Sequence, residues 1–269
     1  TVQENLVAAT NALTGRAVPV GDFSAAGRQA HLADVPVPDV RIDKLSELYQ
    51  PKKTTYATVL FKDPPLTYGE DGGLTPAGLG EVRKADAITV VLRAFESDAV
   101  AAPPKGVDPV RDLRVVLNSL VFADYEVAEK RLARLEKEAK RDGREYQVLK
   151  TVVERPGAGE PLGRQFFSGG DEKRFAGFAF LTAKPIVAVL NDGERSIGHE
   201  AVEAEAKARG IAVFPIRGDL EAEIAQLDAA EQAEFLKDLG ASEPAKNRFL
   251  RHVYAHLELV PRSDIHAHL

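Results

Sequence analysis

Apolar residues recur at every third to fifth position through one long stretch of the chain. Between Asp108 and Gly143 they alternate with charged residues, as expected of a helix that has one apolar face. Asp108 is a suitable N-cap, Pro109 suits the first helical position, and Gly143 interrupts the pattern. A second helical pattern covers residues 144–154. Together the two patterns predict an antiparallel helical hairpin whose first helix is about 50 Å long, at 1.5 Å per residue.

Short apolar runs elsewhere in the chain predict strands. Ile186 to Leu190 is unbroken by any polar residue, which is typical of a strand buried on both faces of a parallel sheet. Helical patterns lie between these runs, and this alternation favours an α/β fold with a mostly parallel sheet. The runs with strand character are residues 54–63, 87–95, 186–190 and 210–216, and the helical patterns outside the hairpin are residues 1–15, 44–49, 198–209, 220–227, 229–239 and 247–259.

Two segments lack a periodic apolar pattern, and we expect them to be loops. Residues 19–35 contain few large apolar side chains, and residues 66–80 are rich in glycine and follow two prolines. Between these segments, Asp39 or Asp43 is placed to cap the short helix over residues 44–49.

Composition narrows the classes of function. The chain has 269 residues and a net charge of −6, so no overall basic excess indicates nucleic-acid binding, and we expect no sequence-specific DNA recognition. No apolar run approaches the roughly twenty residues of a membrane span, so no membrane association is expected. Cysteine is absent, which excludes disulfides, a thiol nucleophile and a cysteine-ligated metal, and fits the cytoplasm.

Polar side chains follow several of the predicted strands. They are Asp63, the pair Asn191 and Glu194, and Arg217 with Gly218. In a parallel sheet these positions share one edge, where α/β proteins bind ligands. A carboxylate there can hold Mg²⁺ beside phosphates, and an amide and a carboxylate three residues apart can contact the edge of a nucleobase. Each residue also has a simpler interpretation, since Asp63 can cap a strand and Asn191 to Glu194 can form a turn.

Several segments in order along the chain resemble the Obg-like ATPases of the YchF type, relatives of the translation-factor GTPases. The resemblance extends from about Ala12 to Leu259. It is carried by Val35 to Thr54, Asp86 to Glu96, Val107 to Leu113, Ala123 to Leu132, Leu181 to Pro185 and Ala222 to Asp228. It implies a P-loop nucleotide-binding domain interrupted by a coiled-coil-like helical hairpin, Mg²⁺-dependent hydrolysis of a nucleoside triphosphate, and association with the ribosome.

The resemblance also implies roles for the residues at the strand ends. Asn191 and Glu194 fall on the base-recognition motif, where GTPases of this class have Asn-Lys-x-Asp and the ATP-preferring Obg-like branch has Glu at the last place. This chain has Asn-Asp-Gly-Glu, which favours ATP over GTP. Asp63 falls on the Asp that is linked to Mg²⁺ in the family, and we expect a water to join it to the ion. No residue is a convincing general base, so no catalytic residue is assigned.

The sequence departs from the family pattern in several places. It contains no Gly-x-x-x-x-Gly-Lys-Ser/Thr motif, which cradles phosphates in this family, and residue 66 is Leu where the motif of Asp63 has Gly. Arg217 and Gly218 stand where the family has Ser-Ala. The chain begins at Thr1 and has no Met, and we expect that the first strand, the phosphate loop and the C-terminal TGS domain are not in the sequence shown.

From these patterns we expect four parts. The nucleotide-binding domain has two halves, residues 1–107 and 175–260. The inserted hairpin and its return linker lie between them, at residues 108–174. Residues 261–269 form an unplaced tail, which we interpret as a remnant of a C-terminal TGS domain. The expected function is that of a cytoplasmic, ribosome-associated ATPase. A GTPase of the same fold and a non-hydrolysing ribosome-binding scaffold with a decayed phosphate site remain the alternatives.

Overall fold

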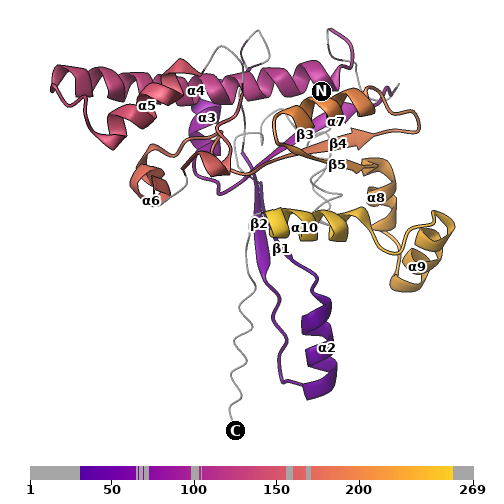
Figure 1. Ribbon diagram of the computed structural model, residues 1–269. Coiled ribbons are helices and arrows are strands. Elements are labelled where there is room, and N and C mark those ends of the chain that lie inside the picture. The colour runs from indigo at the N-terminus through magenta and orange to yellow at the C-terminus, as the bar shows by residue number, and fades with distance from the viewer. Residues whose placement is uncertain are drawn as a thin grey trace.

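The computed structural model describes residues 31–64, 66, 69, 73–97, 103, 105–155, 160–167 and 171–256. The helix predicted over residues 1–15 and the tail 261–269 lie outside the described residues. The described chain combines a parallel sheet, a smaller antiparallel sheet and a long helical arm (Figure 1). This arrangement confirms the predicted α/β class.

A three-stranded parallel sheet forms the centre of the fold. Its strands are β3 (Ile88–Ala94), β4 (Ile186–Asp192) and β5 (Ala212–Ile216), in the order β3-β4-β5. β4 is buried from Ile186 to Asn191, as the unbroken apolar run predicted. Leu113, Leu117 and Leu120 of the arm belong to the apolar core on one face, and Phe249 and Val253 of α10 (Ala245–His256) belong to the core that contains Val187 and Val189.

A second sheet contains β1 (His31–Pro36) and β2 (Thr58–Asp63), which pair in antiparallel orientation. Its apolar face packs on α10. Leu250 of α10 packs with Ala33 and Val35 of β1, and the ring centres of Phe61 and Phe249 lie 6.1 Å apart. The expectation of a loop over residues 19–35 is therefore wrong for its last part. β1 was not recognised because it has few large apolar residues. Its order depends in large part on pairing with β2.

Two short helices flank β2 along the chain. α2 (Val40–Tyr49) begins after Asp39, whose carboxylate accepts a hydrogen bond of 2.9 Å from the Arg41 amide, so Asp39 rather than Asp43 is the cap. α3 (Pro76–Val82) begins inside the segment 66–80 that was expected to be a loop and extends beyond it, which corrects that expectation for residues 76–80. The Thr75 side chain caps α3 and Pro76 occupies its first turn, and these signals outweigh the helix-weakening glycines within it.

The predicted hairpin is present. α4 (Pro109–Lys137) has 29 residues, which corresponds to about 44 Å, and α5 (Arg144–Glu154) folds back along it (Figure 1). The predicted cap is correct, since the Asp108 carboxylate accepts from the Arg111 amide at 2.9 Å. The two helices share an apolar core that includes Ala128, Leu135, Val148, Leu149 and Val152.

The rest of the described chain connects the arm to β4 and follows β4 and β5 in helices. The predicted helices in this part are found within a few residues of their expected ends. No described helix is long and apolar enough to cross a membrane. The remaining elements are η2 (Arg164–Phe167), α6 (Asp171–Phe175), η3 (Ala176–Phe178), α7 (His199–Ala208), α8 (Gly218–Ile224) and α9 (Ala229–Asp238).

Candidate functional site

The ends of β4 and β5 bring Asn191 and Gly218 into direct contact. Asn191 is only 3% exposed, and its Oδ1 accepts a hydrogen bond of 3.0 Å from the Gly218 amide. The register of the parallel strands produces this contact, because Asn191 pairs with Ile216, two residues before Gly218. The structure therefore joins two of the three strand ends selected from the sequence.

Glycine is required on both sides of Asn191 by close packing. A Cβ atom at Gly218 would lie 2.9 Å from Asn191 Oδ1, and a Cβ at Gly193 would lie 2.7 Å from the Cβ of Phe95. Real Cβ atoms do not approach other atoms so closely, so either substitution forces a neighbour to move. The absence of a side chain lets Gly193, after β4, pack against Phe95, which directly follows β3. In the same way it lets Gly218, after β5, pack against Asn191.

A buried arginine lies beside Asn191 on the neighbouring strand. Arg93 of β3 pairs in register with Asn191 and is 7% exposed. Its Nε donates a hydrogen bond of 2.9 Å to the Phe95 carbonyl oxygen, and its guanidinium carbon lies 4.9 Å from the centre of the Phe95 ring. Arg93 thus fixes the end of β3 against which Gly193 packs.

The loop after β4 is held in place by Asp192. Its carboxylate accepts a hydrogen bond from the Ser196 hydroxyl and lies 3.1 Å from Nδ1 of His199, the first residue of α7. His199 Nε2 lies 3.3 Å from Glu203. Burial disfavours the charged imidazole, but the Asp192 and Glu203 carboxylates outweigh burial and raise the pKa of His199 above its usual 6.5.

Glu194 lies on this loop, and Arg217 directly follows the end of β5. Glu194 is exposed. Arg217 donates a hydrogen bond of 2.9 Å from Nη2 to Asp219. This bond with Asp219 raises the pKa of Arg217, and the nearby charges of Asp219, Glu194 and Glu223 act in the same direction. Arg217 therefore lies near three carboxylates, those of Asp219, Glu194 and Glu223.

Asp63 lies elsewhere, at the end of β2 in the antiparallel sheet, where its Cα pairs with that of His31. The expectation that a single parallel sheet places Asp63 on the edge with Asn191 is not met by strand pairing, because β2 pairs with β1 and not with β3, β4 or β5. Within the described residues, no group of three or more His, Cys, Asp or Glu side chains is arranged to hold a metal ion.

A single carboxylate such as Asp63 still fits the chemistry of Mg²⁺ in a nucleotide site. Mg²⁺ usually keeps several waters and takes one or two protein carboxylates together with substrate phosphates. Asp63 is partly buried and is the last residue of β2, where pairing with His31 fixes its backbone position. The metal role of Asp63 stays a prediction.

A buried polar cluster at the base of the arm was not predicted. Asp124 of α4 is 1% exposed and accepts hydrogen bonds from the Leu181 amide at 2.7 Å, the Thr182 amide at 2.8 Å and the Thr182 hydroxyl at 2.7 Å. Arg83, after α3, lies 3.6 Å from Asp124 and donates to the Ala123 and Ala179 carbonyl oxygens at 3.0 Å each. The cluster fastens the arm to the chain that leads into β4.

The ionisation of Asp124 reflects its burial. Desolvation raises the pKa of this carboxyl group, while the amide and hydroxyl donors and the charge of Arg83 oppose the rise. The sequence did contain a signal for this residue, because Asp124 lies on the apolar face of α4 between Leu120 and Ala128. A carboxylate at such a position must be paired when it is buried.

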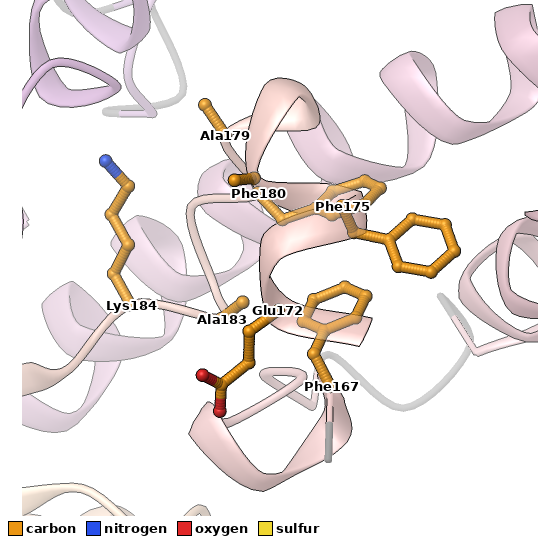
Figure 2. A pocket seen from close by; sticks show the side chains of 8 residues that line it. Phe167, Glu172, Phe175, Ala179, Phe180, Ala183 and Lys184 are labelled. Atoms are coloured by element: carbon orange, nitrogen blue, oxygen red, sulfur yellow. The ribbon is translucent and has the colours of Figure 1, made fainter. Parts of the chain in front are cut away.

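A cavity of about 270 Å³ adjoins this cluster (Figure 2). Stacked phenylalanines form one wall, with the Phe167 and Phe180 rings 5.7 Å apart. Lys184 extends away from the rings in Figure 2, and its Nζ donates to the Arg83 carbonyl oxygen at 2.6 Å and to that of Ala85. These bonds hold the Lys184 ammonium group at one side of the cavity, whose lining also includes the carboxylate of Glu172.

Comparisons with known proteins were made for the whole chain. No family model matches it. It is 32% identical over 261 residues to the ribosome-binding ATPase YchF of Haemophilus influenzae and 30% identical over 265 residues to that of Bacillus subtilis, and each match covers 93% of this chain and 72% of the relative. The structure of the Schizosaccharomyces pombe YchF GTPase superposes with a TM-score of 0.75 at 24% identity, over 95% of this chain and 72% of that one.

The structural match supports the same fold, including a central parallel sheet and substantial helical content. The sequence matches extend across nearly the whole chain and include relatives at 30% identity or above, of which this chain covers more than two thirds. These findings confirm the resemblance seen in the sequence: the chain belongs to the YchF family.

Proposed function

We propose that this protein binds and hydrolyses a nucleoside triphosphate, with ATP preferred over GTP, and that it acts on the ribosome in the cytoplasm. Membership of the YchF family supports the proposal, since the bacterial relatives are named ribosome-binding ATPases and the fission-yeast protein a GTPase. The observation that carries it for this chain is the bond between Asn191 and the Gly218 amide at the edge of the parallel sheet.

Asn191 and Glu194 are the proposed base-binding pair. Asn191 is buried and ties the two loops together, so it sets the position of the Gly218 backbone and of the loop that carries Glu194. Glu194 is exposed and has a carboxylate, which accepts hydrogen bonds but donates none. This pair suits a base that presents an amino group, and the length of Glu favours adenine by resemblance to the ATP-preferring branch.

The phosphate end of the site is proposed on family grounds. Asp63 would hold Mg²⁺ through a water, and the ion would offset negative charge on the phosphates. The residues of this chain supply a fixed backbone and charged groups around the base, and none is assigned as a general base. The domain boundaries at residues 107, 174 and 260 remain part of the proposal, with the hairpin inserted between the two halves of the nucleotide-binding domain.

The proposed ribosome contact lies on the basic residues of the arm. Arg131 and Arg134 lie in ion pairs within the arm, Arg131 with Glu145 at 2.6 Å and Arg134 with Glu138 at 3.0 Å. Lys130, Lys137 and Arg141 are exposed, so their charges are the ones available to an anionic partner.

Nucleotide binding is tested by calorimetric titration of the full chain with Mg–ATP and Mg–GTP, together with phosphate release. We expect tighter ATP binding, and we expect Asn191→Ala to weaken it at least tenfold, since the Gly218 amide then loses its partner. Tighter GTP binding by the unmodified chain would favour the GTPase alternative. Ribosome binding without nucleotide binding would favour the scaffold alternative.

Ribosome binding is tested separately by co-sedimentation at two salt concentrations. We expect the triple variant Lys130→Glu, Lys137→Glu, Arg141→Glu to bind several-fold more weakly, with the difference shrinking at high salt. The matched control is the double variant Lys52→Glu, Lys53→Glu. It reverses two exposed charges that lie just after α2, away from the arm. Equal binding by the arm variant and the control would remove the arm from the proposed contact.

A further inference from the structure

Arg217 directly precedes Gly218, which contacts Asn191 where β4 and β5 end. We propose that Arg217 is a specificity-determining residue of the base site: its guanidinium engages one oxygen of the Glu194 carboxylate, so that the site accepts a purine with one donor beside one acceptor and disfavours guanine. This inference rests on the proposed nucleotide-binding function and names the residue that sets its base preference.

The backbone places Arg217 at the site. It directly precedes Gly218, whose amide is bound to Asn191 at 3.0 Å, and Asn191 lies three residues before Glu194. Gly218 has no room for a side chain beside Asn191. The backbone of residues 217 and 218 therefore packs closely against Asn191. Arg217 and Glu194 therefore flank one edge of the sheet, on the loops after β5 and β4.

The Arg217 guanidinium has more hydrogen-bond donors than its contact with Asp219 uses. Of its five N–H groups, Nη2 makes the bond of 2.9 Å to Asp219, and within the described residues the buried Nε has no hydrogen-bond partner. Asp219 thus holds Nη2, while the neighbouring Nε–H keeps its capacity to donate. Glu194 and Glu223 are both exposed and close enough for their charges to act on Arg217. Glu194 is the one that shares a loop with the end of β4, so it is the partner that we propose for those donors.

The chemistry of the base edges gives the preference. Guanine presents two adjacent donors, N1–H and the N2 amino group, and pairs best with a carboxylate that has both oxygens available. If Arg217 occupies one oxygen, one guanine donor is left unpaired, which is costly in a desolvated site. Adenine presents one amino donor beside the N1 acceptor, and it is satisfied by the remaining Glu194 oxygen and a guanidinium N–H.

The test is calorimetric titration of the full chain with ATP, GTP and ITP, using Arg217→Ser and the control Arg195→Ser. Arg195 is exposed on the same loop as Glu194, so the control removes an equal charge nearby. Hypoxanthine lacks the N2 amino group of guanine, so we expect the unmodified chain to bind ITP more tightly than GTP. We expect Arg217→Ser to shift the ATP-to-GTP affinity ratio toward GTP by about tenfold and to abolish the advantage of ITP.

An unchanged ratio in Arg217→Ser, or an equal shift in Arg195→Ser, overturns the inference while leaving nucleotide binding intact. Failure of the unmodified chain to bind any of the three nucleotides overturns the proposed function and this inference with it. Arg217→Lys keeps the charge but not the planar fork, and it is expected to give a smaller shift than Arg217→Ser. If Arg217→Lys shifted the affinity ratio as much as Arg217→Ser does, the result would also contradict the pairing that we propose.

Discussion

Two polar clusters in this protein look alike in composition but differ in how completely their hydrogen bonds are made. At the base of the arm, Asp124 is almost fully buried, and its carboxylate accepts from two amides and a hydroxyl beside Arg83. At the edge of the parallel sheet, Arg217 keeps a buried Nε–H without a partner among the described residues, and Glu194 faces solvent. The first cluster is saturated and the second is not.

This difference separates a structural role from a binding role. A saturated buried carboxylate stabilises one arrangement of the chain and has nothing left to offer a ligand. A cluster with an unpaired donor and an exposed acceptor can still form hydrogen bonds with a polar ligand, which then compensates for the water removed from the carboxylate. The comparison predicts that changes at Asp124 act on stability, while changes at the edge of the sheet act on binding.

The largest effect is expected for Asp124→Ala. The variant leaves the Leu181 and Thr182 amides without their acceptor and removes the charge opposite Arg83, so we expect a loss of about 3–5 kcal/mol in the free energy of unfolding. Urea unfolding followed by circular dichroism measures it. Asp142→Ala, at an exposed position between α4 and α5, is the control and should change the value by less than about 0.5 kcal/mol. Equal losses in the two variants would contradict the structural role of Asp124.

A smaller effect on stability is expected for Gly218→Ala. The new Cβ would lie 2.9 Å from Asn191 Oδ1, so Asn191 must move and its bond to the residue 218 amide weakens. We expect a loss of about 1–3 kcal/mol in unfolding free energy, as for overpacked sites, together with weaker ATP binding. Gly177→Ala has no atom within 4 Å of the new Cβ and serves as the matched control. A variant as stable as the control and with unchanged ATP affinity would show that the contact is unimportant.

The smallest effect concerns the pH dependence contributed by His199. Its pKa is raised in the folded state, despite burial, by the Asp192 and Glu203 carboxylates. A raised pKa means that the folded state binds the proton more tightly, so the contribution is fully present below the unfolded value of 6.5 and is lost as pH rises through the folded value. We expect the unmodified protein to lose more stability between pH 6 and pH 8 than His199→Gln does. Parallel pH profiles in the two proteins would refute this assignment.

Much of the fold could be predicted because its strongest elements have regular patterns. The arm follows from the helical period after Asp108, and β4 follows from the apolar run that begins at Ile186. β1 was missed because a short strand with small side chains depends on its partner for order. α3 was missed because Gly78 and Gly80 obscured the helix signal given by Thr75 and Pro76.

The candidate site was only partly predictable. The position of Asn191 after a buried strand was visible in the sequence, but its bond to Gly218 depends on the register between strands that are 27 residues apart at this contact. The same holds for Asp124, whose partners come from residues 57 and 58 positions away. Asp63 was expected on the same edge from the assumption of one parallel sheet, and the antiparallel pairing of β2 with β1 shows why that assumption was too simple.

The central claim is that a nucleotide binds at the edge of the sheet formed by Asn191, Glu194 and Gly218, and the most direct test is amide hydrogen exchange with and without Mg–ATP. We expect ATP to slow exchange in residues 191–196 and 217–219 more than in the chain around Leu181 and Thr182, whose amides are already bound to Asp124. Protection that is absent at the edge, or that is no greater there than around Asp124, would contradict the account.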